Sequence, residues 1–525
     1  MEPRLRAVCD LGVAEAREGG GRHEYDGRVQ DLSPGGVRRG LAALGGDPLP
    51  DPYDEALVAA QEAGLRAFYG ELRLHRRNPM PHLANLDVSG YDREYAPAGQ
   101  RSEARTRHLA SWPAAVDGSV AALDEMTPAI ATATLSAARG LSVGLDADDP
   151  VESAALAAHA RLVAHLEAAA GSGDGGDGDS GDGADGALGP AALGADGLTL
   201  LLSATEATDV DLTALAARAE AERDRLRAML DEACGRLAPG RPVAELVPEL
   251  LRDHPDADGV IAEAQALTDE VIAWAAERRL VPYSDGTCVV APAPESRQWA
   301  MAMMAWAAPG EPDTPSFYWV TPPRPEWPEH EQAEWLQVFS RTTLPAITVH
   351  EVAPGHFSHG LALRHAPTEP RRLFGSEAFI EGWAHYVEEV AIEEGFHADD
   401  PRYVIGVSVE ALLRVTRLAC SIGLHANGMT VAEAGRRFEQ DAFLAGQAAL
   451  SEARRGTFDP TYGRYTWGKL EIRDLRERAR RDWGAEFDLP RFHAAMLELG
   501  APPLGLLAYA LAGGPAPADG SRPSG

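Results

Sequence analysis

The sequence contains few cysteines and no long apolar run. Its 525 residues include four cysteines, Cys9, Cys234, Cys288 and Cys420, and no two of them form a CxxC pair. This spacing argues against a disulfide framework or a thiolate zinc knuckle and favours isolated buried thiols. No segment reaches the ~20 apolar residues needed to cross a bilayer, and the N-terminus lacks the apolar core of a signal peptide. We therefore expect a cytoplasmic protein without a membrane partner.

Basic residues are also scarce. Lys and Arg total 48 against 80 Asp and Glu, which gives a net charge of -32 at pH 7. Such an acidic surface repels nucleic-acid backbones and anionic lipid, so we expect no nucleic-acid partner. Hydrophobic residues make up 45% and charged residues 24% of the chain, the composition of a folded globular protein. The charge favours solubility, and the oligomeric state stays open.

Glycine and aspartate are concentrated in one segment, GSGDGGDGDSGDGADG, at residues 171–186. It lacks the twelfth-position Glu and flanking helices of an EF-hand, and the spaced apolar residues of a glycine-rich β-roll. We interpret residues 171–190 as a disordered insertion, and residues 513–525 as a disordered tail. These segments divide the chain into a helical N-terminal region, 1–170, and a second region, 191–512.

The periodicity of the remaining chain is mainly helical. Apolar residues recur at three- and four-residue steps in residues 211–237, 259–280 and 430–449. A β-like region interrupts this pattern between about residues 281 and 321, where TCVVAPA, RQWAMAMMAW and SFYWVT stand between turn residues. The sequence therefore predicts a mainly α fold with a small sheet ahead of a helical catalytic half.

Histidines gather in one part of the second region. Seven of the sixteen lie between His350 and His425, and the motif HEVAPGH places Glu351 beside His350 and ahead of His356. Two imidazoles with a carboxylate bind Zn²⁺ and leave a place for water, and the adjacent Glu is a candidate general base. Six residues apart, two side chains diverge by about 120° on an unbroken helix. Pro354 and Gly355 between them predict a kink or π-bulge that brings both histidines to one ion.

A third ligand is expected from the next helix. Residues 376–390 carry apolar side chains at helical spacing and a polar row of Glu381, His385 and Glu388. Glu381 is the candidate ligand, Glu377 one turn earlier is its rival, and His385 and Glu388 are candidates for orienting the ligands. A solvated polar face is the alternative for this row.

At this point a resemblance becomes apparent. HEVAPGH, FIEGWAHYVEE, RLACSIGLHANGMTVAEA and YTWGKLEIRDLRERA resemble, in this order, the bacterial family called domain of unknown function 885. That family looks like a branch of the gluzincin metallopeptidases. The resemblance implies a mainly helical fold with a small antiparallel sheet beside the zinc helix, a deep cleft and one Zn²⁺. It also implies His350, His356 and Glu381 as ligands and Glu351 as general base. Phe357 replaces the second histidine that the family usually has.

Four further residues are assigned roles beside simpler alternatives. Tyr465 is a candidate hydrogen-bond donor to a developing oxyanion, or a packed core residue. His425 is a candidate contact to substrate, or a helix cap. Arg414 and Arg417, three apart on a helix, are candidates for binding a substrate carboxylate, with exposed salt bridges as the alternative.

Three further interpretations complete the site. The segment SFYWVT, which contains Tyr318, is either the sheet edge along which substrate lies or an ordinary buried strand. His359 is an alternative ligand or an ordinary histidine. Trp383 and Trp467 are interpreted as core residues.

The predicted activity is zinc-dependent hydrolysis of short peptides, since by analogy of fold a helical cleft favours short peptides over folded proteins. The alternatives are a zinc hydrolase of a non-peptide amide or ester, and a non-catalytic binding or scaffold protein.

Overall fold

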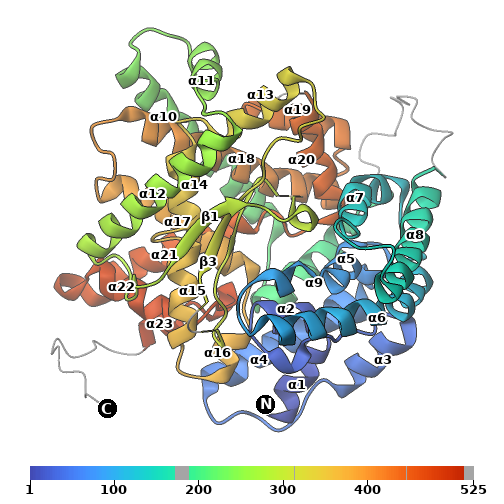
Figure 1. The fold of residues 1–525 in the computed structure, drawn as a ribbon. Coiled ribbons are helices and arrows are strands. Elements are labelled where there is room, and N and C mark those ends of the chain that lie inside the picture. Colours follow the sequence, from blue (N-terminus) through green and yellow to red (C-terminus); the bar gives the residue numbers. More distant parts are fainter. Residues whose placement is uncertain (172–188, 299, 312–313, 445, 513–525) are drawn as a thin grey trace.

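The computed structural model describes residues 1–171, 189–298, 300–311, 314–444 and 446–512. Nearly all of the insertion predicted at 171–190, and the tail predicted at 513–525, lie outside these residues. The described chain is mainly helical, as predicted, with helices wrapped around one small sheet (Figure 1). Several helices begin at a side chain that caps the first backbone N–H groups, for example Asp51, Asp211 and Ser376.

The first part of the chain packs as short and medium helices on one side of the molecule (Figure 1). These helices are α1 (Pro3–Asp10), α2 (Val13–Glu18), α3 (Pro34–Ala43), α4 (Pro52–Leu65), α5 (Met80–Leu86), α6 (Ala98–Ala122), α7 (Pro128–Gly140), α8 (Pro150–Gly171) and α9 (Gly194–Glu206). A π-helical turn follows α4 at Arg66–Glu71.

The second part contains the three strands and the longer helices. The strands are β1 (Cys288–Pro292), β2 (Ala302–Ala305) and β3 (Ser316–Val320). The helices are α10 (Leu212–Leu237), α11 (Val243–Leu251), α12 (Ala257–Arg278), α13 (Glu329–Leu336), α14 (Leu344–Glu351), α15 (His356–His365), α16 (Glu369–Leu373), α17 (Glu377–Glu393), α18 (Pro401–Ala426), α19 (Val431–Ala442), α20 (Gly446–Phe458), α21 (Arg464–Trp483), α22 (Leu489–Leu497) and α23 (Tyr509–Ala512). Residues 430–449 thus belong to two helices, and Phe443 between them has a left-handed φ of 57°.

The sheet is mixed, which corrects the expected antiparallel arrangement. The strand order is β1-β3-β2; β3 runs parallel to β1 and antiparallel to β2. A parallel pair needs a long crossover, and the chain between β1 and β3 provides it while also forming β2. Because β3 is the central strand, it offers no edge to a substrate, and β2 occupies one outer position of the sheet.

One hydrophobic core joins the start and the end of the chain. Leu5, Tyr53 and Leu57 share a cluster with Trp383 and Phe492, from helices more than 300 residues later. Helices α5 to α8 bury a separate cluster around Trp112 and Leu162. Among the described residues, no helix is both long and apolar enough to span a membrane.

Helices α17 and α21 cross at two glycines, and this contact sets the geometry of the site. A Cβ on Gly468 would lie 1.8 Å from the backbone oxygen of Ala378, and one on Gly382 would lie 2.5 Å from the Cα of Gly468. Only glycine permits so close an approach. The crossing therefore fixes α21, which carries Tyr465, against α17, which carries Glu381.

Candidate metal centre

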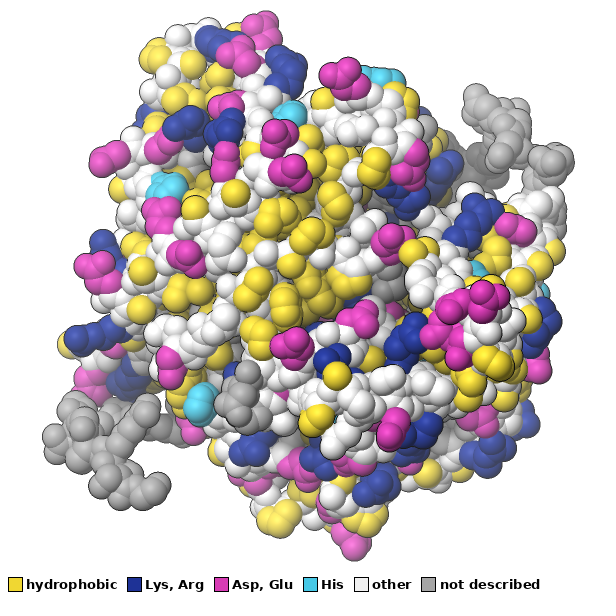
Figure 2. All heavy atoms as spheres, in the orientation of Figure 1, with side chains coloured by type: hydrophobic (Ala, Val, Ile, Leu, Met, Phe, Trp, Pro, Cys, Tyr) yellow, Lys and Arg dark blue, Asp and Glu magenta, His cyan; other side chains and the backbone are white. Residues whose placement is uncertain are grey.

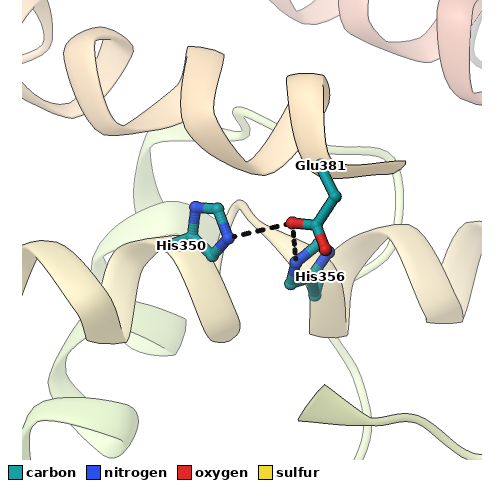
Figure 3. A group of neighbouring side chains, drawn as sticks. All are labelled: His350, His356 and Glu381. Carbon is teal, nitrogen blue, oxygen red and sulfur yellow. Dashed lines mark ion pairs between the residues drawn. The ribbon is translucent and has the colours of Figure 1, made fainter. Parts of the chain in front are cut away.

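Three side chains from three helices converge on one point. His350 is in the last turn of α14, His356 is the first residue of α15, and Glu381 lies in the second turn of α17 (Figure 3). Each offers one ligand atom, and these atoms lie within 4.8 Å of one another. Glu381 Oε2 is 3.4 Å from His350 Nε2 and 3.3 Å from His356 Nε2. The structure thus brings together the ligand set that the sequence predicts.

The chain between the two histidines ends one helix and begins another. The predicted kink or π-bulge within a single helix is therefore wrong: α14 ends at Glu351 and α15 begins at His356. Pro354 has no N–H with which to continue α14. A Cβ on Gly355 would lie 1.9 Å from the backbone oxygen of His350, so the return of the chain requires glycine there. As a result the two imidazole rings stand at 87°, with centroids 4.8 Å apart.

Trp383 contacts the loop between α14 and α15. Its ring is fully buried, as expected of a core residue, and its Nε1 donates a hydrogen bond of 2.9 Å to the backbone oxygen of Pro354. Because Trp383 lies two residues after Glu381, α17 supplies both a ligand and the contact that fixes the loop between the other two ligands.

Glu388 orients His350. The fully buried Glu388 carboxylate lies 2.7 Å from His350 Nδ1, and since a carboxylate accepts, Nδ1 donates and Nε2, which faces Glu381, is the nitrogen left for a metal ion. His385 Nδ1 and Arg414 also contact Glu388, at 3.3 and 3.1 Å. Burial opposes the ionisation of Glu388, but Arg414, His385 and His350 together hold its pKa below the usual range. His385 and Glu388 thus lie where the sequence places them, behind a ligand.

The separations of Glu381 Oε2 from the two histidine nitrogens match those between ligands of a tetrahedral ion. Ligands bound to zinc at about 2.0–2.1 Å with tetrahedral angles lie about 3.3 Å from one another. The two separations from Glu381 are 3.3 and 3.4 Å, and all three ligand atoms lie within 4.8 Å of one another. Charge-assisted hydrogen bonds are shorter, about 2.7–2.9 Å. Burial and Arg414 oppose protonation of His350, yet Glu381 and Glu388 raise its pKa to about 9. The pocket therefore favours a positive charge between these ligands, which a divalent cation supplies.

Glu351 lies next to this group with one oxygen unused. The residue is 6% exposed, and its Oε2 is buried without a hydrogen-bond partner in the described structure. Burial raises the pKa of Glu351, while His356 and His350 act in the opposite direction. A buried carboxylate with a free oxygen has the form expected of a general base that awaits a water molecule.

Tyr465 packs against His350. Its ring is roughly parallel to that of His350, at 24° and 6.3 Å between centroids. The guanidinium carbons of Arg414, Arg417 and Arg464 lie 5.9, 5.2 and 5.6 Å from the ring centre. These cation–π contacts hold the phenol beside the ligand group. Tyr465 thus lies beside His350, its role as a hydrogen-bond donor stays a prediction, and Arg464 was not foreseen.

Arg414 and Arg417 do not form exposed salt bridges. Arg414 is buried and contacts Glu388, and its Nη2 lies 3.5 Å from Glu410. Arg417 donates two hydrogen bonds, of 2.7 and 2.8 Å, to Glu452. These carboxylates occupy the donors that were assigned to a substrate, so the structure opposes that assignment.

Two other predicted contacts lie away from the ligand group. Tyr318 is fully buried on the central strand, which favours the ordinary-strand interpretation over a substrate edge. His425 Nε2 binds the backbone oxygen of Gly456 at 2.7 Å, about 16 Å along α18 from Arg414. This distance favours the helix-end role.

The two rival ligands also stand outside the group of three. His359 is buried and its Nε2 lies 3.0 Å from the backbone oxygen of Gly500. Glu377 is exposed, one turn before Glu381 on α17. A cavity of about 410 Å³ lies at Gly20–Glu24, Pro309, Gly310, Glu369 and Arg372–Leu373, with none of the three ligands in its lining.

Three contacts at the site were not predicted from the sequence. They are the hydrogen bond of Trp383 to Pro354, the contact of Arg464 with Tyr465, and the contact of Trp306 with His356. Trp306 follows β2 and lies 6.2 Å from the His356 ring, between centroids. Their signals were weak, because a tryptophan at helical spacing indicates a core position and an isolated arginine indicates solvent. The proximity of Pro354 to Trp383 depends on tertiary packing alone.

Comparison with known proteins identifies relatives of the whole chain. A family model described as a bacterial protein of unknown function (DUF885) matches residues 16–511. A structure from Shewanella oneidensis, described as a candidate lipoprotein of unknown function, aligns over 97% of this chain and 98% of its own, with 19% identity and a TM-score of 0.74. A candidate lipoprotein from Colwellia psychrerythraea aligns over 98% and 99%, with 17% identity and a TM-score of 0.72.

These two structures share the fold. The search of curated proteins found no match. Because the family model covers nearly the entire sequence, the chain belongs to the bacterial DUF885 family.

Proposed function

We propose that the protein is a zinc-dependent hydrolase that cleaves short peptides. The observation that carries this proposal is the convergence of His350, His356 and Glu381. The unpartnered Glu351 interacts electrostatically with all three. Two imidazoles and one carboxylate form the ligand set of many catalytic zinc sites, which keep a fourth position for water.

In this proposal each residue around the ligands has a separate role in the hydrolysis. A bound Zn²⁺ would polarise the substrate carbonyl and lower the pKa of a water molecule towards ~7. Glu351 accepts the proton of the attacking water and returns it to the leaving amine. Glu388 keeps His350 in the tautomer and orientation that a ligand needs. Tyr465 is the donor that we assign to the developing oxyanion.

Strand β2 is the surface that we propose for the substrate backbone. It is an outer strand, so in the described part of the sheet its far edge has no strand partner. All four of its residues are partly exposed, and hydrophobic side chains gather over this sheet on the surface (Figure 2). Trp306 directly follows β2, and its ring lies beside that of His356. An extended peptide paired with β2 would therefore run towards the ligands. A deep cleft for short peptides is part of this proposal.

The test compares two variants with the wild-type protein in zinc content and turnover. We expect one zinc per chain in the wild-type protein and in Glu351→Gln, and loss of zinc in His350→Ala. Turnover of a short-peptide library should fall at least a hundredfold in Glu351→Gln, because a general base contributes 10²–10⁴-fold. A parallel panel of acyl amides and esters distinguishes peptide hydrolysis from the other zinc hydrolases. Unchanged turnover in Glu351→Gln would overturn the proposed mechanism.

A further inference from the structure

One carboxylate next to the ligand group has no hydrogen-bond or ion-pair partner in the described part of the chain. Glu377 precedes Glu381 by one turn on α17, so their side chains lie on the same face of the helix. The Glu377 side chain is exposed, whereas His350, His356 and Glu351 are buried. Among the described residues, no hydrogen bond or ion pair involves Glu377. It therefore marks a side from which solvent, and hence substrate, reaches the ligands.

The nearby arginines already contact acids of the protein, although Arg464 shares Asp459 with Arg455. Arg464 is the positive group whose charge Glu377 experiences most strongly. It is held by two hydrogen bonds to Asp459, of 2.8 and 3.1 Å. Arg417 and Arg414 are bound to Glu452 and Glu388. Each of these guanidinium groups thus contacts an acid of the protein, whereas Glu377 forms no hydrogen bond or ion pair within the described residues.

The second acid beside the ligands, Glu351, differs from Glu377 in burial and in its proposed role. Glu351 is more than nine-tenths buried beside the ligands, and its Oε2 has no hydrogen-bond partner among the residues that the structure describes. Its proposed task is to handle the proton of water, so it does not compensate a charged substrate group. Glu377 has no such task. An exposed carboxylate one turn from a ligand is free to form a charge-assisted hydrogen bond with a substrate cation.

We propose that Glu377 binds a protonated amino group of the substrate, so that the enzyme selects short peptides with a free amino group next to the bond it cleaves. This inference rests on the proposed hydrolase function and names its substrate class. Recognition of a substrate carboxylate by the arginines is the competing arrangement. The contacts above disfavour it, because each guanidinium already binds an acid of the protein.

The first test compares matched peptides that differ in one charge. Leu-Gly-Gly and N-acetyl-Leu-Gly-Gly are assayed with the wild-type protein, Glu377→Gln and a control, Glu331→Gln, which alters an exposed glutamate on α13. We expect the wild-type and control proteins to cleave the free peptide at least tenfold more efficiently, by kcat/KM. Glu377→Gln should lose that preference and keep its activity on the acetylated peptide. Equal rates on both peptides in the wild-type protein, or equal losses on both in Glu377→Gln, would overturn the proposal.

The second test measures binding without turnover. Zinc-loaded proteins are titrated calorimetrically with leucine hydroxamate and with N-acetyl-leucine hydroxamate. The wild-type protein should bind the free amine at least tenfold more tightly, and Glu377→Gln should bind both equally with unchanged zinc content. Equal affinities in the wild-type protein would overturn amine recognition while leaving the hydrolase proposal intact. A zinc-loaded wild-type protein that binds neither compound and cleaves neither peptide would refute both proposals.

Discussion

Two consecutive glutamates on α17, Glu388 and Glu389, belong to buried ionic clusters of different kinds. Glu389 and Glu222 share two cations. Lys469 Nζ lies 2.5 and 2.8 Å from the two acids, and Arg225 lies 2.6 and 2.7 Å from them. Each acid of this closed cluster therefore meets at least two positive groups.

The cluster around Glu388 is open by comparison. Its carboxylates, Glu351, Glu381, Glu388 and Glu410, have one arginine among them, Arg414, which pairs with Glu388 and Glu410. Within the described chain, Glu351 Oε2 is buried without a hydrogen-bond partner. A closed cluster holds helices together, whereas the open cluster lacks positive charge at the point where three ligand atoms converge. This difference separates a structural network from a candidate metal site on one helix.

The largest expected effect concerns the closed cluster. Lys469→Met leaves Glu222 and Glu389 with too little positive charge in the interior, and breaking a buried pair in this way costs about 3–5 kcal/mol. We expect urea unfolding to show a loss of this size, with unchanged zinc content in the folded protein. Loss of zinc from folded Lys469→Met would mean that the two clusters are not separate.

A third buried acid, Glu206, forms no ion pair within the described residues. It accepts hydrogen bonds from Ser376 and from the backbone of Leu504, yet burial raises its pKa to about 7. Because this pKa exceeds the unfolded value of about 4.3, its stabilising contribution is complete below about pH 4 and is lost as the pH rises through 7. Glu206→Gln remains neutral. We expect its stability relative to the wild-type protein to increase by about 2–3 kcal/mol between pH 4.5 and pH 8 in urea unfolding. A constant difference across this range would contradict the assigned pKa.

Substitutions of the neighbouring residues Glu388 and Glu389 should differ in their effect on zinc affinity. Glu388→Gln weakens the acceptor that orients His350, and loss of such a partner costs 10–100-fold in metal affinity. Glu389→Gln is the matched control, and its zinc affinity should equal that of the wild-type protein. Competition with a chromogenic chelator measures both dissociation constants. Equal affinities in the two variants would show that Glu388 has no part in holding the metal.

The smallest expected effect concerns the loop between the histidines. Trp383→Phe keeps an aromatic side chain, although a smaller one, and removes the hydrogen bond to Pro354, a contribution of about 0.5–1.5 kcal/mol. We expect zinc affinity to fall by two- to tenfold. Trp467→Phe, whose Nε1 binds Glu471 instead, is the control. If both variants lose affinity equally, the loop is not held by Trp383 in particular.

The helices and the ligand group were predictable because their signals are local. Apolar periodicity predicts α10, α12 and α17, and HEVAPGH with a glutamate on the next helix predicts the ligands. Interactions between distant segments were not predictable. The parallel pairing of β1 with β3, and the pairing of Arg417 with Glu452, depend on segments 28 and 35 residues apart. The break between α14 and α15 was expected only as a bend, because the crowding of Gly355 against His350 is visible in three dimensions alone.

X-ray absorption spectroscopy of the zinc-loaded protein tests the central claim most directly. We expect one zinc per chain, bound by two imidazole nitrogens and carboxylate or water oxygens at about 2.0–2.2 Å. Replacement of His356 by alanine should remove one imidazole from this shell or abolish stoichiometric binding. A wild-type protein that takes up no stoichiometric zinc, or whose zinc has no imidazole ligand, would refute the proposed metal centre.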